Sequence, residues 1–139
     1  MEETIYVIML KDSKTGFLEK ELSSITLSEN DEYMINLFVT ENGGEQQLNM
    51  RLSTGRDVAD WEYDAVFDYY DPSALEGIGA AVCEMTDDYN PVWLVTLPFD
   101  AENAEQTAEN VLKIHRAEIE DVFETIKDKE AEYTEGSNG

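Results

Sequence analysis

The chain has 139 residues and a formal net charge of −23, from 32 acidic and 9 basic side chains. Such a charge repels the phosphates of nucleic acids and of anionic membranes, so we expect neither as a direct partner. The hydrophobic fraction of 42% is that of a globular protein rather than of an acidic disordered chain. The length fits a single domain, which we place at residues 1–133 and follow with a disordered polar tail at 134–139.

Cys83 is the only cysteine, so the chain cannot form an internal disulfide. This usage is typical of a reducing compartment. The first ten residues, MEETIYVIML, lack the basic start of a secretory signal, and no stretch approaches the ~20 apolar residues of a membrane span. We therefore expect a cytoplasmic protein of bacterial type, with Cys83 buried in a strand as a small apolar residue.

Alternating apolar residues and turn signals predict four strands in the first half of the chain. Residues 4–10, TIYVIML, are apolar on both alternate faces, as in a central strand. Asn42-Gly43 predicts a hairpin between the third and fourth strands, since type I′ turns need two residues with positive φ. The predicted strands span 4–10, 17–27, 33–40 and 46–52.

Residues 60–71, DWEYDAVFDYYD, carry an acid at nearly every other position, and Val66 alone breaks the alternation. We predict a fifth strand with an aromatic inner face and a solvated acidic outer face. Neighbouring acids on one face of a strand lie about 6.7 Å apart, where they repel by roughly 0.6 kcal/mol in water but about 2.5 kcal/mol at an effective dielectric of 20. The row of acids is therefore stable only in solvent or against a basic partner.

After an Asp-Pro helical turn at 71–77, residues 79–86 and 92–97 form a last predicted hairpin. The hydrophobic period then changes from two to 3.6, which predicts one long helix from 101 to about 131. Its apolar stripe comprises Ala104, Ala108, Val111, Leu112, His115, Ile119, Val122, Phe123 and Ile126.

The predicted fold class is α+β: an antiparallel meander sheet of about seven strands with one long C-terminal amphipathic helix packed on one face. One helix leaves the second face of the sheet open, although the first and third strands are apolar on both faces. We therefore expect either a strongly curved sheet or a homodimer that covers this face.

Residues 57–112 contain 14 carboxylates and no Lys, Arg or His, so these acids cannot form ion pairs within the span. Solubility alone could explain them, but they also fit a binding surface for cations. The predicted surface comprises Asp57, Asp60, Glu62, Asp64, Asp68, Asp87 and Asp88. We expect a non-enzymatic interaction protein whose partner is a protein with a basic surface. A mimic of DNA that inhibits a basic protein is an alternative.

Metal and cofactor chemistry find little support in the sequence. Calcium needs six to eight converging oxygens, whereas acids along one strand diverge, so Asp57, Asp71, Asp87 or Asp88 would have to contribute from other segments. One His and one Cys cannot build a zinc site of several such ligands. No phosphate-loop pattern is present. We expect neither a metal nor a cofactor.

The rival hypothesis is a small enzyme or ligand-binding domain with a pocket between helix and sheet, lined by Tyr63, Phe67, Trp93 and His115. His115 is the only histidine and lies on the apolar stripe. Such a residue is either a core histidine with satisfied hydrogen bonds or a general base. A closed core around His115 would argue against the pocket.

Overall fold

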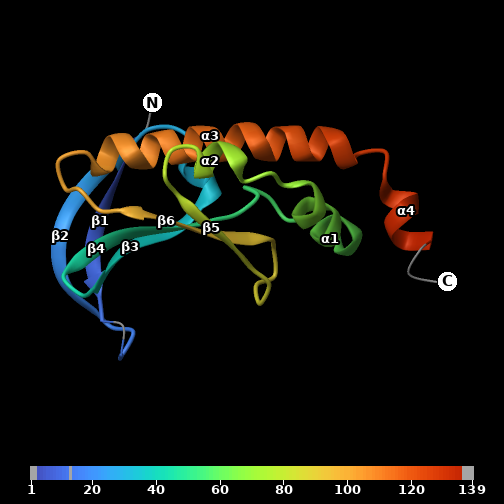
Figure 1. The fold of residues 1–139 in the computed structure, drawn as a ribbon. Helices are drawn as coiled ribbons and strands as arrows, with labels where there is room; N and C mark the ends of the chain where they lie inside the picture. Colours follow the sequence, from blue (N-terminus) through green and yellow to red (C-terminus); the bar gives the residue numbers. More distant parts are fainter. Residues whose placement is uncertain (1–2, 13, 136–139) are drawn as a thin grey trace.

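The computed structural model describes residues 3–12 and 14–135 (Figure 1). Its strands are β1 (Thr4–Lys11), β2 (Leu18–Leu27), β3 (Met34–Asn42), β4 (Glu45–Leu52), β5 (Ala81–Met85) and β6 (Val92–Pro98). Its helices are the short 3-10 helix η1 (Asp31–Tyr33), α1 (Asp60–Tyr69), α2 (Ser73–Glu76), α3 (Ala104–Ile126) and α4 (Glu130–Glu135). The mixed α+β class is as predicted, but the described residues form six strands rather than about seven.

The strands form one mixed sheet in the order β2-β1-β3-β4-β6-β5. All neighbours are antiparallel except β1 and β3, which run parallel and pair through Leu10 and Val39. The prediction of a purely antiparallel meander is therefore wrong. β1 is an interior strand, so both of its edges are paired, by β2 and by β3. Because β2 ends where β1 begins, the link at 28–33 starts β3 from that same end and makes it parallel to β1.

Residues 60–69 form helix α1, so the predicted fifth strand is wrong. Asp60, Asp64 and Asp68 are four residues apart and share one exposed helical face. On the inner side, Ala65 and Val66 are both 0% exposed. Val66 was the exception to the alternating pattern, and the helical period accounts for it.

Two hydrogen bonds mark the ends of this helical region. Glu62 accepts a hydrogen bond from the backbone N–H of Ala59 at 2.8 Å, which satisfies a donor at the start of α1. Asp71 accepts one from the N–H of Ser73, the first residue of α2, at 2.9 Å, although Pro72 rather than Asp71 occupies the N-cap position. Local polar side chains therefore support both helices.

Helix α3 lies across one face of the sheet (Figure 1). Every residue of its predicted apolar stripe is buried there except Phe123, which is partly buried. Opposite them lie the inward side chains of β4 and β6, namely Leu48, Met50, Leu52, Trp93, Val95 and Leu97. This single contact layer forms most of the core.

The C-terminal region differs from the prediction of one helix to about residue 131. Helix α3 ends at Ile126, and α4 follows after a short turn. Tyr133 of α4 packs against Trp61 of α1, with ring centroids 6.3 Å apart. Residues 134–135 of the predicted tail therefore belong to α4, and 136–139 lie outside the described residues.

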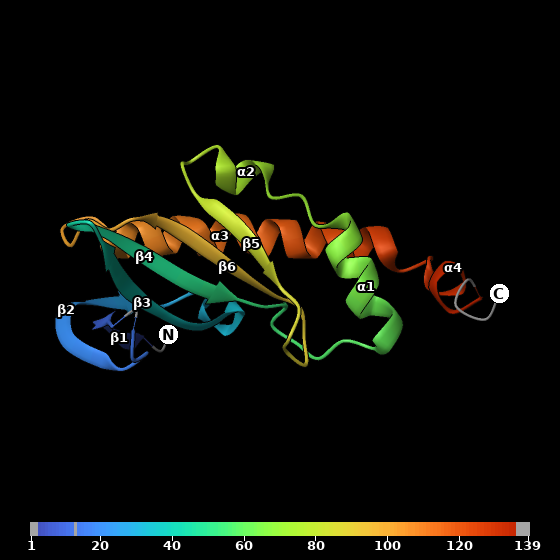
Figure 2. The ribbon, with the colours of Figure 1, turned by 60° about the horizontal axis from the view of Figure 1, so that its bottom comes forward.

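The opposite face of the sheet carries no helix within residues 3–12 and 14–135 (Figures 1 and 2). On β1, Ile5 and Val7 are 69% and 46% exposed. Figure 1 shows β1 and β2 turned away from the direction of the other strands, so the sheet is bent at the β1–β3 boundary. The exposure of Ile5 and Val7 shows that the bend does not cover this whole face, and the homodimer stays a prediction.

Gly55 supplies a first testable prediction. Its φ is +75°, and an added Cβ would lie 2.9 Å from Cε1 of Tyr33. The Tyr33 ring also packs against His115, at 5.8 Å between centroids. We expect Gly55→Ala to lower the free energy of unfolding by the ~1–2 kcal/mol of left-handed backbone plus a further packing cost. Urea unfolding measures this loss.

Gly16→Ala is the matched control, because Gly16 has φ +76° and nothing within 4 Å of an added Cβ. Equal losses for the two variants would show that contact with Tyr33 adds nothing.

Candidate binding surfaces

The predicted acidic residues gather at one end of the molecule, where α1 adjoins the β5–β6 turn. The pKa of the Tyr63 hydroxyl is raised, first by burial and then by the carboxylates of Asp88, Asp87 and Asp64. These acids come from two segments more than twenty residues apart, yet all three lie close enough to one α1 side chain to raise its pKa. Asp57 joins them through Asn90, whose Nδ2 donates to Asp57 Oδ1 at 2.9 Å. Asp64 therefore lies near Asp87 and Asp88, but it stands on a helix rather than on the predicted strand.

The seven acids of this surface are not equally satisfied. Glu62 pairs with Arg56 at 3.2 Å, and Asp88 pairs with Arg51 at 3.2 Å. At the other end of α1, the hydroxyl of Tyr133 donates to Asp68 at 2.7 Å. Asp57 accepts the hydrogen bond from Asn90. The last three carboxylates are exposed and make no side-chain hydrogen bond or ion pair with any described residue; they are Asp60, Asp64 and Asp87.

The predicted pocket residues also come together, but as a packed aromatic cluster. Tyr63 and Phe67 lie 5.2 Å apart between ring centroids, and Phe67 lies 5.2 Å from Trp93. Trp93 in turn lies 5.4 Å from His115 and stacks on Tyr70 at 4.3 Å. Trp93 is 1% exposed and His115 0% exposed. The space around His115 is therefore filled by protein side chains.

Both ring nitrogens of His115 have partners. Its Nε2 lies 2.6 Å from the backbone carbonyl of Ser53, and its Nδ1 lies 2.8 Å from the hydroxyl of Tyr70. A carbonyl only accepts, so Nε2 carries the proton and Nδ1 accepts from Tyr70. Burial lowers the pKa of His115 to about 4, against a smaller opposing effect of the Ser53 bond. The imidazole is therefore neutral at pH 7 and has no free nitrogen for proton transfer.

Two buried polar atoms in the same cluster have no hydrogen-bond partner among the described residues: the hydroxyl of Tyr63 and Nε1 of Trp93. Unsatisfied buried donors are uncommon and usually cost free energy. The Tyr63 hydroxyl lies beside the acidic residues described above, so its burial accompanies the assembly of that surface.

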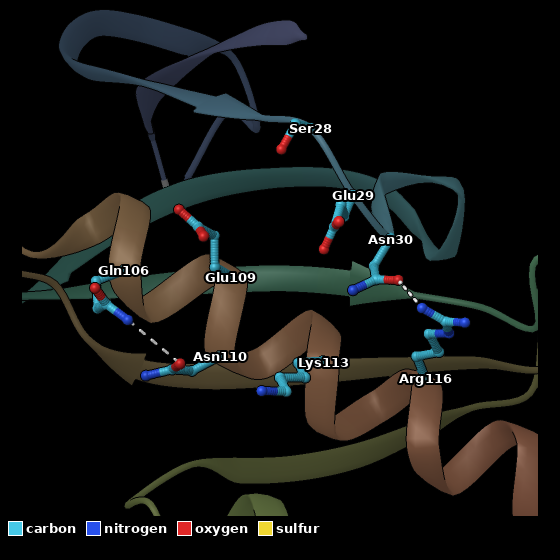
Figure 3. A pocket seen from close by; sticks show the side chains of 8 residues that line it. All are labelled: Ser28, Glu29, Asn30, Gln106, Glu109, Asn110, Lys113 and Arg116. Carbon is cyan, nitrogen blue, oxygen red and sulfur yellow. Dashed lines mark hydrogen bonds between the residues drawn. The ribbon is translucent and has the colours of Figure 1, made fainter. Parts of the chain in front are cut away.

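A polar groove runs between α3 and the link after β2 (Figure 3). It has a volume of about 330 Å³ and is lined by Ser28, Glu29, Asn30, Gln106, Glu109, Asn110, Lys113 and Arg116. Arg116 Nη1 donates to Oδ1 of Asn30 at 3.1 Å and closes one end. Asn30 adopts φ 67°, a conformation that Asn tolerates better than most residues. The groove thus depends on a local backbone turn and one arginine.

Sequence reasoning missed this groove, although the α3 residues recur every three or four positions opposite the apolar stripe. Its lining includes two acids and two bases, so it exerts no strong net attraction on either sign of charge. Seven of the eight side chains are exposed to solvent. The groove has the properties of a solvated helix face.

Three smaller expectations can be compared with the structure. Cys83 lies in β5 as predicted but is exposed, because it faces the side of the sheet that carries no helix, so its predicted burial is wrong. Among the described residues, no three His, Cys, Asp or Glu side chains are placed to hold a metal ion. None of the described helices combines the length and apolar character needed to cross a membrane.

The fold and its surfaces define an acidic α+β domain with one closed face and one open face. A protein-family model described as "Family of unknown function (DUF6762)" matches residues 1–134, and the chain belongs to this family. No curated protein sequence and no solved structure matches it.

The enclosed histidine makes stability depend on pH. Below the ordinary pKa of 6.5 an unfolded His115 binds a proton, whereas folded His115 resists protonation until about pH 4. The unfolded state is therefore favoured as the pH falls from 6.5 to 4, and the loss approaches roughly 3 kcal/mol. Urea unfolding at several pH values would measure it.

His115→Gln removes this titration while leaving the surface carboxylates in place. We expect the stability difference between wild type and His115→Gln to shrink as the pH falls from 7 to 4.5. A difference that stays constant over this range would contradict the assignment.

Proposed function

We propose that the protein is a non-enzymatic interaction module that binds a protein with a basic surface through its acidic end. We define the acidic end as Asp57, Asp60, Glu62, Asp64, Asp68, Asp87 and Asp88. The observation that carries the proposal is a set of three exposed carboxylates without ion pairs among the described residues: Asp60 and Asp64 share one face of α1, and Asp64 and Asp87 both lie near Tyr63.

Like charges held side by side repel one another, and a cation placed between them relieves that repulsion. The carboxylates that already have Arg51 or Arg56 as partners show how this chain neutralises such acids internally. The three unpaired carboxylates can form such ion pairs with lysines or arginines of another protein. The net charge of −23 would also steer a basic partner toward the molecule.

An aromatic side chain adds a second means of holding a cation. Tyr89 lies in the β5–β6 turn directly after Asp87 and Asp88 and is 81% exposed. Lysine and arginine bind favourably over the face of such a ring, and more strongly when carboxylates are close by. An exposed tyrosine directly after two acids is therefore suited to a basic side chain of a partner.

The non-enzymatic character of the proposal is supported by the state of His115. The one imidazole of the chain is enclosed, neutral and bonded at both nitrogens. The rival pocket lined by Tyr63, Phe67, Trp93 and His115 has an aromatic cluster where a substrate would have to lie.

A titration followed by NMR tests the proposal. A synthetic peptide of about ten residues, rich in lysine and arginine, serves as the probe. We expect backbone amide shifts to concentrate in α1 and residues 86–91 and to disappear as salt rises, since exposed charges are screened beyond about 8 Å at physiological ionic strength. Neutralising Asp60→Asn, Asp64→Asn and Asp87→Asn together should weaken binding by about tenfold or more, which is ~1.4 kcal/mol.

The matched control is Glu3→Gln, Glu45→Gln and Glu102→Gln, which changes the net charge equally at exposed positions outside α1 and the β5–β6 turn. If both triple variants weaken binding equally, net charge alone is responsible and the acidic end is not a site. Shifts spread evenly over all acidic segments would contradict it as well. Competition by duplex DNA for a basic protein bound at this end would favour the DNA-mimic version.

A further inference from the structure

The open face of the sheet contains a cavity with a volume of about 550 Å³. Its lining residues come from the β1–β2 turn and from all six strands. This volume is within the range of small-molecule sites. Its lining residues are Lys11, Gly16, Leu18, Asn36, Leu37, Phe38, Arg51, Met85 and Leu94.

Apart from Leu37, which belongs to the core, the apolar lining of the cavity comes from side chains that the core does not use. Phe38 and Leu94 point away from α3 because their neighbours in β3 and β6, such as Val39 and Val95, face the core. Phe38 and Leu94 are half-buried, and Leu18 is 57% exposed. Together with Met85 they offer an apolar surface to an occupant.

The charged part of the cavity has the opposite sign to the rest of the molecule. The lining includes two cations, Lys11 and Arg51, and no carboxylate, in a chain with 32 acidic residues. Lys11 Nζ lies 4.5 Å from the centroid of the Phe38 ring and has no ion pair with any described residue. Arg51 uses Nη2 toward Asp88 at 3.2 Å and keeps further N–H donors. The two cations can therefore bind an anion next to the apolar side chains of the cavity.

We propose that this cavity binds a small amphipathic carboxylate, with the carboxylate between Lys11 and Arg51 and the apolar body on Phe38, Leu94 and Met85. Arg51 offers charge-assisted hydrogen bonds in the planar geometry that carboxylates fit, and Lys11 adds a second charge. The ligand must carry its own negative charge, because only an anion gains from both cations.

A second copy of the chain is a poorer occupant of the same cavity. In a two-fold dimer the same patch meets itself, so Lys11 and Arg51 of one copy would approach those of the other. Each copy also brings a net charge of −23. A small anion meets neither objection, since it contacts only the local cations.

Calorimetric titration of the full chain with octanoate tests the proposal, with octanol as the neutral ligand of equal chain length. We expect saturable 1:1 binding of octanoate and binding of octanol at least about tenfold weaker, because the neutral ligand lacks the charge-assisted bonds. Methyl NMR signals of Leu18, Met85 and Leu94 should shift with octanoate at the same concentrations.

Lys11→Gln together with Arg51→Gln should weaken octanoate binding by at least about tenfold. The single variant Lys11→Gln keeps the Arg51–Asp88 ion pair and provides a test should the double variant unfold. Lys113→Gln with Lys127→Gln is the control, since it makes the same change in net charge away from the cavity and should leave binding unchanged.

Three results would overturn the proposal: no saturable binding of octanoate, equal affinity for octanol, or equal weakening by the control pair. Light scattering accompanies the titration. A dimer that octanoate does not dissociate, with the Leu94 methyls protected in the free protein, would assign the cavity to a second copy instead.

Discussion

The contact between the apolar stripe of α3 and one face of the sheet determines where the other elements lie. At its centre, His115 is bonded to Ser53 after β4 and to Tyr70 after α1. Breaking either bond would leave a buried polar group unsatisfied, which costs about 1–3 kcal/mol. The helix therefore cannot slide along the sheet or rotate without losing one of them. Because α3 and α1 share this face, the opposite face is left without a helix among the described residues.

The spacing of apolar residues predicted the type of secondary structure correctly where a segment was long or its pattern fitted only one period. The stripe of α3 repeats over 23 residues, and the strands β3 to β6 are bounded by recognisable turns. For residues 60–71 the period was ambiguous, and the prediction from it was wrong. The acids at nearly every second residue fit a strand, whereas Asp60, Asp64 and Asp68, four residues apart, fit a helix. Val66 and the bond from Ala59 to Glu62 distinguish the two, and both favour the helix.

Strand order was less accessible to sequence reasoning than strand location. Reading residues 4–10 as a central strand was correct, and it already required partners on both edges. A meander supplies only one partner to the first strand, so the second had to come from a later segment. Which segment pairs with the second edge of β1 depends on contacts between residues far apart in the chain. The local hydrophobic pattern does not predict such contacts.

The same distinction between local and distant contacts explains what was found at the binding surfaces. The acidic end could be proposed from the sequence because all seven of its residues belong to one span without a basic side chain. The cavity on the open face was not, since Lys11, Phe38, Arg51 and Leu94 come from four different strands. Only the register of the sheet brings these residues to one place.

The ion pair between Arg51 and Asp88 links the two proposed surfaces. Asp88 belongs to the acidic end, and Arg51 lines the cavity, so each neutralises a group that an external ligand would otherwise contact. A basic partner that takes over Asp88 would free donors of Arg51 for an anion, and an anion that engages Arg51 would free Asp88 for the partner. By thermodynamic linkage the two effects on affinity must be equal. The pair is part-exposed, with side chains 26% and 34% accessible, so its own strength is modest and the coupling would be modest too. The acidic surface and the cationic cavity would thus be coupled because Asp88 and Arg51 can each replace the other by an external ligand.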